Sequence, residues 1–174
     1  SCAAPSMLTV DSTSATGAVI SWTAEAEITS WEYQLLISGE TPAETGTASS
    51  DNPLTITGCY SNTSYDLYIR TDCGGTYSSW AMASFTTNPA CGDTLYDSGG
   101  SDGDYASNEL TTVTVFPEND GDLVTFTFLS FNTEANYDDL TVYDGPDTLS
   151  TIVGVFDGTE IPDPISSTHA TGAL

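Results

Sequence analysis

Short segments in which apolar and polar residues alternate dominate this sequence, and they constrain its fold more than any other feature. The clearest is residues 65–71, where Tyr, Leu and Ile alternate with Asp, Tyr and Arg. Residues 140–143 alternate in the same way. A period of two residues predicts half-buried β-strands. Clusters of Gly, Pro, Asn, Asp and Ser separate the segments, and no segment has the pattern of a helix, so we expect an all-β protein built as β-sandwiches.

The predicted strands fall into two groups along the chain. Seven lie in the first half, enough for one small antiparallel sandwich: residues 7–11, 18–23, 31–37, 45–49, 54–56, 65–71 and 80–86. Four lie in the second half: residues 110–116, 123–131, 139–143 and 152–156. Within 123–131 the apolar side switches, which predicts a bulge. Pro89 ends the strand before it, so we expect two tandem sandwich domains, 1–88 and 91–174.

The charge of the chain excludes several classes of partner. It has 174 residues, with 25 acidic side chains against one basic side chain, Arg70, and a net charge of −24. Nucleic-acid binding depends on Lys and Arg, so we expect no nucleic-acid partner, and docking on anionic lipid is disfavoured. No apolar run approaches the ~20 residues of a membrane span, so we expect no direct insertion into a membrane.

The four cysteines, Cys2, Cys59, Cys73 and Cys91, indicate an oxidising compartment. None forms a CxxC pair and the chain has one His, so a zinc site is not expected. An even number of cysteines in a Ser- and Thr-rich chain predicts two disulfides, with three possible pairings. The chain opens without a signal peptide, and we interpret it as a mature or excised part of a secreted or cell-surface protein.

An acidic cluster precedes the strand at 139–143. Glu134, Asp138 and Asp139 supply carboxylates within six residues. Calcium takes about 6–8 oxygen ligands, and such a cluster at a strand end provides them. The alternative interpretation is that these side chains are solvated turn residues on an acidic surface.

The first half resembles fibronectin type III domains. Residues 58–65, Gly-Cys-Tyr-Ser-Asn-Thr-Ser-Tyr, are similar to the Gly-Leu-x-Pro-x-Thr-x-Tyr loop of that family, with Cys59 at the Leu position. Trp22 matches its core Trp, and residues 85–87, Phe-Thr-Thr, match its last strand. The resemblance implies that Tyr65 makes a tyrosine corner, in which its hydroxyl bonds back to the backbone.

The second half resembles CUB domains, a jelly-roll sandwich family. The matching segments are residues 126–131, then 137–145 (Tyr-Asp-Asp-Leu-Thr-Val-Tyr-Asp-Gly), then 154–158. The Asp-Ser-Gly-Gly opening at 97–100 looks like CUB-type modules that accompany fibronectin type III modules in secreted proteins of Bacteroidetes. The usual CUB cysteines are absent. The sequence stops where the last strands of the family should begin, so we expect the second sandwich to be incomplete.

The CUB resemblance implies a calcium site. In many CUB domains a Glu near a strand end and the Asp of a Tyr-Asp motif bind calcium together with a later Asp. Carried over, Asp138 is the Tyr-Asp carboxylate and Glu134 is the nearest candidate for the Glu. The later Asp would lie past Leu174. We expect Asp97 and the region of Tyr105 to complete the set.

The fibronectin type III resemblance implies a disulfide pairing. Its strands run alternately up and down, so Cys2 and Cys73 belong to one pole of the sandwich. Cys59 and Cys91 belong to the other. A disulfide needs Cα atoms within about 7 Å. We therefore expect the bonds Cys2–Cys73 and Cys59–Cys91.

Four sites match patterns of glycosylation. Three triplets fit the O-glycosylation pattern of Bacteroidetes, in which Asp is followed by Ser or Thr and then by an apolar residue or Thr. They place the modified residues at Ser12, Thr94 and Thr148. The segment 62–64, Asn-Thr-Ser, fits the N-glycan sequon at Asn62. Short patterns of this kind occur by chance in a chain rich in Thr and Asp, so both kinds of site are predictions about the modified protein.

These features favour a non-catalytic extracellular module pair. A Ser-His-Asp site would have to use His169, the single histidine, and we expect no enzymatic activity. The expected roles are adhesion, binding of an extracellular protein or glycan, or a rigid spacer steadied by calcium. The alternatives are accessory domains of a secreted hydrolase or protease, or a structural subunit of a surface filament. Neighbouring domains or subunits of the same surface assembly would then also be partners.

Overall fold

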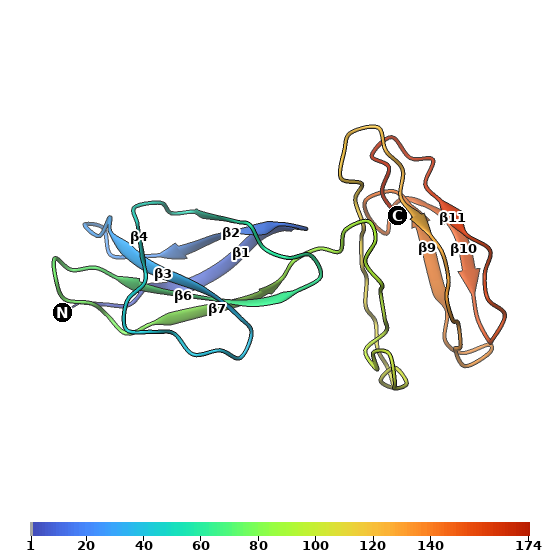
Figure 1. Cartoon of the computed structure of the whole chain (residues 1–174), viewed down its shortest axis with the longest axis horizontal. Helices are drawn as coiled ribbons and strands as arrows, with labels where there is room; N and C mark the ends of the chain where they lie inside the picture. The colour runs from blue at the N-terminus through green and yellow to red at the C-terminus, as the bar shows by residue number, and fades with distance from the viewer. Residues whose placement is uncertain (1) are drawn as a thin grey trace. The chain divides into compact units, whose positions relative to one another are not determined.

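The computed structural model describes residues 2–174, and these residues form strands and loops without any helix (Figure 1). The described chain therefore has no helix that could cross a membrane. It divides into two compact units, one ending at Asn88 and one beginning at Pro89. We call them the N-terminal unit and the C-terminal unit. The expectation of an all-β, tandem sandwich fold is confirmed.

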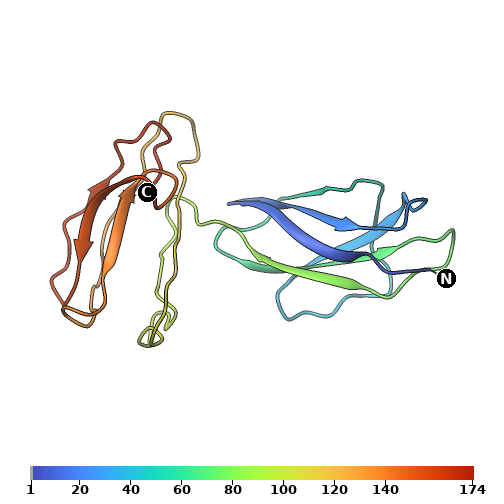
Figure 2. The ribbon, with the colours of Figure 1, turned by 180° about the vertical axis from the view of Figure 1, so that it is seen from behind.

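The N-terminal unit is a sandwich of two antiparallel sheets, and all seven strands predicted for it are present. One sheet has the order β1-β2-β5 and the other β4-β3-β6-β7. The strands of the first sheet are β1 (Ser6–Ser14), β2 (Gly17–Thr23) and β5 (Leu54–Thr57). Those of the second are β3 (Trp31–Ile37), β4 (Thr47–Ser49), β6 (Ser64–Thr71) and β7 (Ala81–Thr86). From behind, β1 lies beside β7, where the two sheets meet (Figure 2).

The alternation in each strand produces the core of this unit. Ile20, Leu67 and Ile69 are completely buried between the sheets. Trp22 and Trp31 meet edge to face, with ring centroids 5.2 Å apart. Tyr65 is also buried, and its hydroxyl accepts a hydrogen bond from the backbone N–H of Tyr60 at 2.9 Å. The predicted tyrosine corner is therefore confirmed.

One of the two expected disulfides is present. Cys2 and Cys73 are bonded, with their Cα atoms 6.0 Å apart. The expected bond between Cys59 and Cys91 is wrong, because both are thiols in this structure. The side chain of Cys59 is buried in the hydrophobic core, where a free cysteine packs as a small apolar residue. Burial also raises the pKa of this thiol. The sequence prediction placed Cys59 and Cys91 at the same pole of the sandwich, and a shared pole alone does not bring two cysteines within bonding distance.

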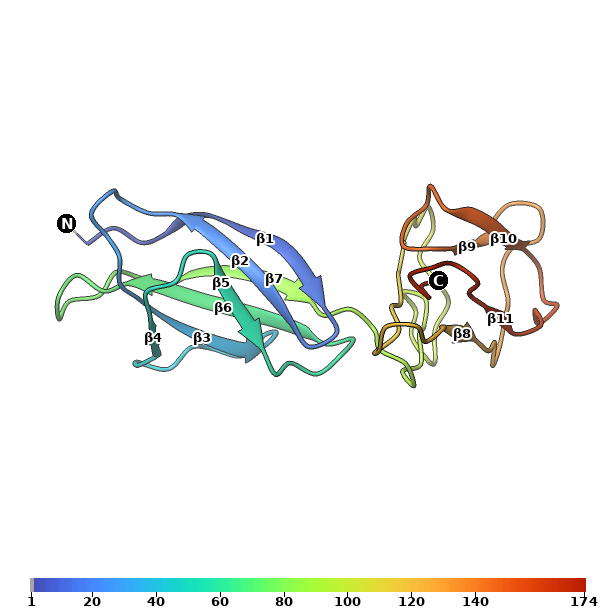
Figure 3. The same cartoon turned by 90° about the horizontal axis from the view of Figure 1, so that it is seen from above.

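The C-terminal unit has two short antiparallel ladders that lie in opposite layers (Figure 3). One pairs β9 (Leu140–Asp144) with β10 (Thr151–Phe156), and the other pairs β8 (Thr125–Phe126) with β11 (Ile165–Ser166). Between the layers lies a small core of buried apolar side chains: Val115, Val124, Val142 and Leu174. Phe126, Phe128, Phe156 and Ile165 pack against it.

The strand predictions for this unit are partly wrong. The strands at 139–143 and 152–156 are confirmed, but 110–116 is not a strand and 123–131 is reduced to β8. Isolated backbone pairs replace continuous ladders there: Val115 exchanges both hydrogen bonds with Leu174, and the N–H of Val124 donates to Gly172. The bulge expected within 123–131 is found instead in β10, between Ile152 and Gly154.

Candidate functional site

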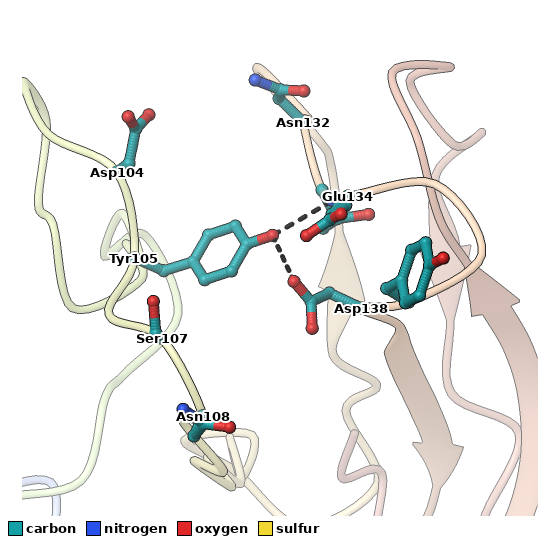
Figure 4. A pocket seen from close by; sticks show the side chains of 9 residues that line it. Asp104, Tyr105, Ser107, Asn108, Asn132, Glu134 and Asp138 are labelled. Carbon is teal, nitrogen blue, oxygen red and sulfur yellow. Dashed lines mark hydrogen bonds between the residues drawn. The ribbon is translucent and has the colours of Figure 1, made fainter.

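The candidate site is an open pocket of the C-terminal unit beside the turn that leads into β9 (Figure 4). Two segments far apart in the sequence, 104–108 and 132–138, line it: Asp104, Tyr105, Ser107, Asn108, Asn132, Thr133, Glu134, Tyr137 and Asp138. Most of these side chains end in oxygen atoms or amides. The pocket volume of ≈ 650 Å³ is larger than one ion with its waters needs, so space remains for a group from a partner.

Tyr105 connects the two sides of this pocket. Its side chain points from the 104–108 segment toward Glu134 and Asp138 (Figure 4). The hydroxyl donates a hydrogen bond to Oδ2 of Asp138 at 2.8 Å and accepts one from the backbone N–H of Glu134 at 3.1 Å. The bond to the Asp138 carboxylate raises the pKa of Tyr105, because losing the proton would place two negative charges together.

A single tight turn sets the positions of Glu134 and Asp138. The backbone N–H groups of Tyr137 and Asp138 both donate to the carbonyl of Glu134, each at 3.0 Å. Asn136 has a φ of 68°, which Asn tolerates better than most residues. Its N–H donates to the carboxylate of Asp157 at 2.6 Å, which anchors the turn to the end of β10. The turn thus places both predicted ligands at one pocket.

The structure does not bring Asp97 to the same pocket. Its carboxylate accepts the N–H of Gly99 at 2.9 Å and so closes its own turn. Asp104 lines the pocket instead, although its carboxylate points away from the Tyr105 hydroxyl (Figure 4). Asn108 and Asn132 also line it, and our sequence interpretation did not select them. Their side chains are common in turns, so no local pattern distinguished them.

The side chains of the pocket carry the kinds of oxygen atom that a hard cation binds, but they do not form a complete ligand set. Carboxylate, amide and hydroxyl oxygens are the ligands that calcium prefers. Within residues 2–174, however, no three His, Cys, Asp or Glu side chains gather closely enough to hold a metal ion. An ion here would be held by Asp138 and Glu134, with Asn108 and Asn132 nearby and water for the remaining positions.

No basic side chain offsets the charge of this pocket. Residues 89–174 contain sixteen acidic residues and neither Lys nor Arg. Arg70, in the N-terminal unit, is already paired: its Nη2 lies 2.6 Å from Glu32 and its guanidinium carbon 4.1 Å from the Tyr77 ring centroid and 4.4 Å from that of Trp80. The hydrogen bond from Arg70 lowers the pKa of Glu32. The pocket therefore carries a negative charge that no Lys or Arg of its own unit balances.

A Ser, a His and an Asp meet at the end of β9, but not in the arrangement of a catalytic triad. Ser167 donates its hydroxyl proton to Asp144 at 2.7 Å, and the backbone N–H of His169 donates to the same carboxylate at 3.0 Å. The His169 ring instead has its Nδ1 2.8 Å from the hydroxyl of Thr171. A triad needs the ring between the nucleophile and the carboxylate, so this cluster has a structural role.

The predicted glycosylation residues are all on the surface. Ser12, Thr94, Thr148 and Asn62 are exposed, as a modified side chain must be. Thr63, the next residue of the Asn62 sequon, has its hydroxyl bonded to the carbonyl of Ser61 at 2.7 Å. Exposure alone does not establish modification, so the four sites stay predictions.

Parts of the chain are similar to known proteins. Residues 96–172, which include the pocket, match the CUB domain family. Two solved structures are similar to parts of the chain. One is a computationally redesigned β-sandwich protein, with a TM-score of 0.40 and 23% identity, covering 49% of this chain and 94% of that one. The other is the fn3 domain of the human collagen alpha-1(XX) chain, with a TM-score of 0.44 and 15% identity, covering 55% and 93%.

Proposed function

We propose that this chain is a non-catalytic extracellular module pair whose C-terminal unit binds a protein ligand at the Tyr105–Asp138 pocket with the help of calcium. The observation that carries the proposal is the tyrosine bridge. One hydroxyl draws together the Asp138 carboxylate and the turn that holds Glu134. CUB domains are typically extracellular, and the Cys2–Cys73 disulfide agrees with an oxidising compartment.

The pocket would recognise a partner through charge. Its carboxylates lie in a unit without Lys or Arg, so a bound calcium ion would reduce their mutual repulsion and order the turn at 134–138. The carboxylate oxygens that remain free would accept hydrogen bonds from a Lys or Arg of the partner. The N-terminal unit, with its disulfide and its full sandwich, would serve as a rigid support.

Thermal unfolding with and without calcium tests the proposal. Calcium at about 100 times its Kd stabilises the folded state by about 2.7 kcal/mol, since it binds only that state. We expect Tm of the C-terminal unit to rise in calcium for the wild type but not for Asp138→Asn. Asp163→Asn is the matched control, because Asp163 is exposed and lies outside the pocket.

Two results would contradict the calcium site. One is an equal rise of Tm in the wild type and in Asp138→Asn. The other is the absence of any rise at millimolar calcium, which would leave the carboxylates as a solvated acidic surface. Isothermal titration with calcium gives the stoichiometry and separates one site from diffuse screening.

A further inference from the structure

The β9–β10 ladder has one face toward the core of the C-terminal unit and one face away from it. The face that points away from the core is the outward face. Val142 points into the core, and its register partner is Gly154. A Cβ atom on Gly154 would come within 2.3 Å of the Phe156 ring, so that ring occupies the inner side. Side chains alternate across a strand. The outward members of the register pairs are therefore Thr141, Tyr143, Ile152 and Val155.

This face is unusually apolar for a surface. Ile152 is 55% exposed and Val155 54%. Val153, the extra residue of the bulge, is 44% exposed, so three apolar side chains of one strand face solvent. Single exposed apolar residues are ordinary, but contiguous ones mark interaction surfaces. We call Ile152, Val153 and Val155 the outer strip.

The outer strip borders a free strand edge. β10 pairs with β9 in a two-stranded sheet, and no backbone hydrogen bond joins residues 151–156 to another segment of the described chain. Such an edge accepts an added strand through its N–H and C=O groups. Outward side chains of the added strand would lie directly beside Ile152 and Val155.

The acidic residues near β10 favour an added strand that carries basic side chains. The last register pair of the ladder is Leu140 with Phe156. The residues just beyond this pair are Asp139 and Asp157, and both are exposed. They lie just beyond the Val155 end of the ladder, and the carboxylate of Asp157 also accepts the N–H of Asn136 at 2.6 Å. Sixteen carboxylates without Lys or Arg in this unit would repel a second copy of the chain.

We propose that β10 binds, by strand addition, an extended segment of another protein with apolar residues at positions i and i+2 and Lys or Arg at i+4. The two apolar side chains cover the outer strip, and the cation lies beside Asp139 and Asp157. The outer strip itself contains no residue that lines the Tyr105–Asp138 pocket, and its binding would not require calcium.

The test is a titration of the isotope-labelled full chain with synthetic peptides in the presence of a chelator, followed by amide NMR. The probe is an acetylated Ser-Val-Thr-Val-Thr-Lys peptide. One control peptide has Glu in place of Lys, and another has Ser in place of both Val. We expect shifts concentrated in residues 151–156, and affinity about tenfold weaker for each control peptide.

A protein variant provides an independent arm. Ile152→Thr combined with Val155→Thr keeps two β-branched residues and so the strand propensity, and it should weaken probe binding about tenfold. Val113→Thr is the matched control, since Val113 is exposed outside the ladder. The amide spectrum reports whether each variant is folded, and the control peptides test the wild type itself.

Several results would overturn the inference. They are equal binding of the three peptides, shifts centred outside β10, or unchanged affinity in a folded Ile152/Val155 variant. Line broadening of β10 that grows with protein concentration without peptide would identify a second copy as the occupant instead. Binding that requires calcium and maps to Tyr105 and Asp138 would overturn this inference but support the proposed function.

Discussion

Asp144 shows how one carboxylate can organise a small unit. It is 9% exposed and accepts hydrogen bonds from the hydroxyl groups of Ser167 and Thr168 and from the backbone N–H groups of Thr168 and His169. These donors favour the ionised form and lower the pKa of Asp144 well below its ordinary range. They also fasten the end of β9 to the segment at 167–169.

The C-terminal unit should therefore lose stability in acid. An Asp has a pKa of about 3.9 in an unfolded chain. Because the folded pKa is lower, the contribution of Asp144 is complete above that value and is lost as the pH falls below it. We expect Asp144→Asn to lower stability at pH 7 and to reduce the fall in stability between about pH 5 and pH 2. Hydrogen exchange of the Val142 amide measures this.

The matched control is Asp147→Asn. Asp147 is exposed and bonds only within its own turn, to the N–H of Leu149 and the hydroxyl of Ser150. Identical pH profiles for wild type and Asp144→Asn would show that the Ser167–His169 contacts contribute nothing to stability.

At the scale of the element, the bulge in β10 decides what the C-terminal unit buries. It moves Ile152 and Val153 to solvent and leaves Gly154 on the inner side opposite Val142. The Phe156 ring fills the space that a side chain at 154 would take. A strand of regular period would have placed a different set of side chains in the core.

Gly154→Ala should destabilise the C-terminal unit. The new methyl would overlap the Phe156 ring at 2.3 Å and force it out of its place against the core. Overpacking of this kind costs about 1–3 kcal/mol. Urea unfolding followed by far-UV circular dichroism would measure it. Val153→Ala, in the exposed extra position, should change stability far less, and equal losses for the two variants would contradict this packing.

At the scale of the whole molecule, the two units depend on different sources of stability. The N-terminal unit has a core of eleven buried residues and a disulfide that closes 71 residues of chain. The C-terminal unit has four buried core residues and relies on hydrogen bonds such as those of Asp144. We expect the C-terminal unit to unfold first.

Loss of the Cys2–Cys73 bond should affect the N-terminal unit alone. Removing a native disulfide from a small domain costs about 2–5 kcal/mol. All three Trp residues lie in this unit, so Trp fluorescence in urea reports its unfolding. We expect Cys73→Ser to lower the urea midpoint and Cys91→Ser, at an exposed thiol, to leave it unchanged. A comparable loss in Cys91→Ser would contradict this and would indicate that Cys91 forms a disulfide with Cys59.

Local patterns predicted the N-terminal unit well because its strands are long and each alternates for several residues. In β6 the buried side chains Tyr65, Leu67 and Ile69 follow the predicted parity. The C-terminal unit was harder, because its pairs are short and the bulge in β10 changes the parity. Residues 110–116 alternate in sequence, yet Leu110 is 96% exposed and no ladder forms there.

The sequence alone determined the all-β class, the two-part organisation and the acidic cluster of Glu134 and Asp138, because these depend on strong periodicity or on residues close together in the chain. The tyrosine corner and the Cys2–Cys73 bond followed from the resemblance to fibronectin type III domains, since that bond joins residues 71 positions apart. Only the tertiary structure decided that Tyr105 bonds to Asp138, that Asp97 does not join them, that Cys59 is core and that Val153 is exposed. Each of these is a contact between distant segments or a change of register, and a local pattern contains neither.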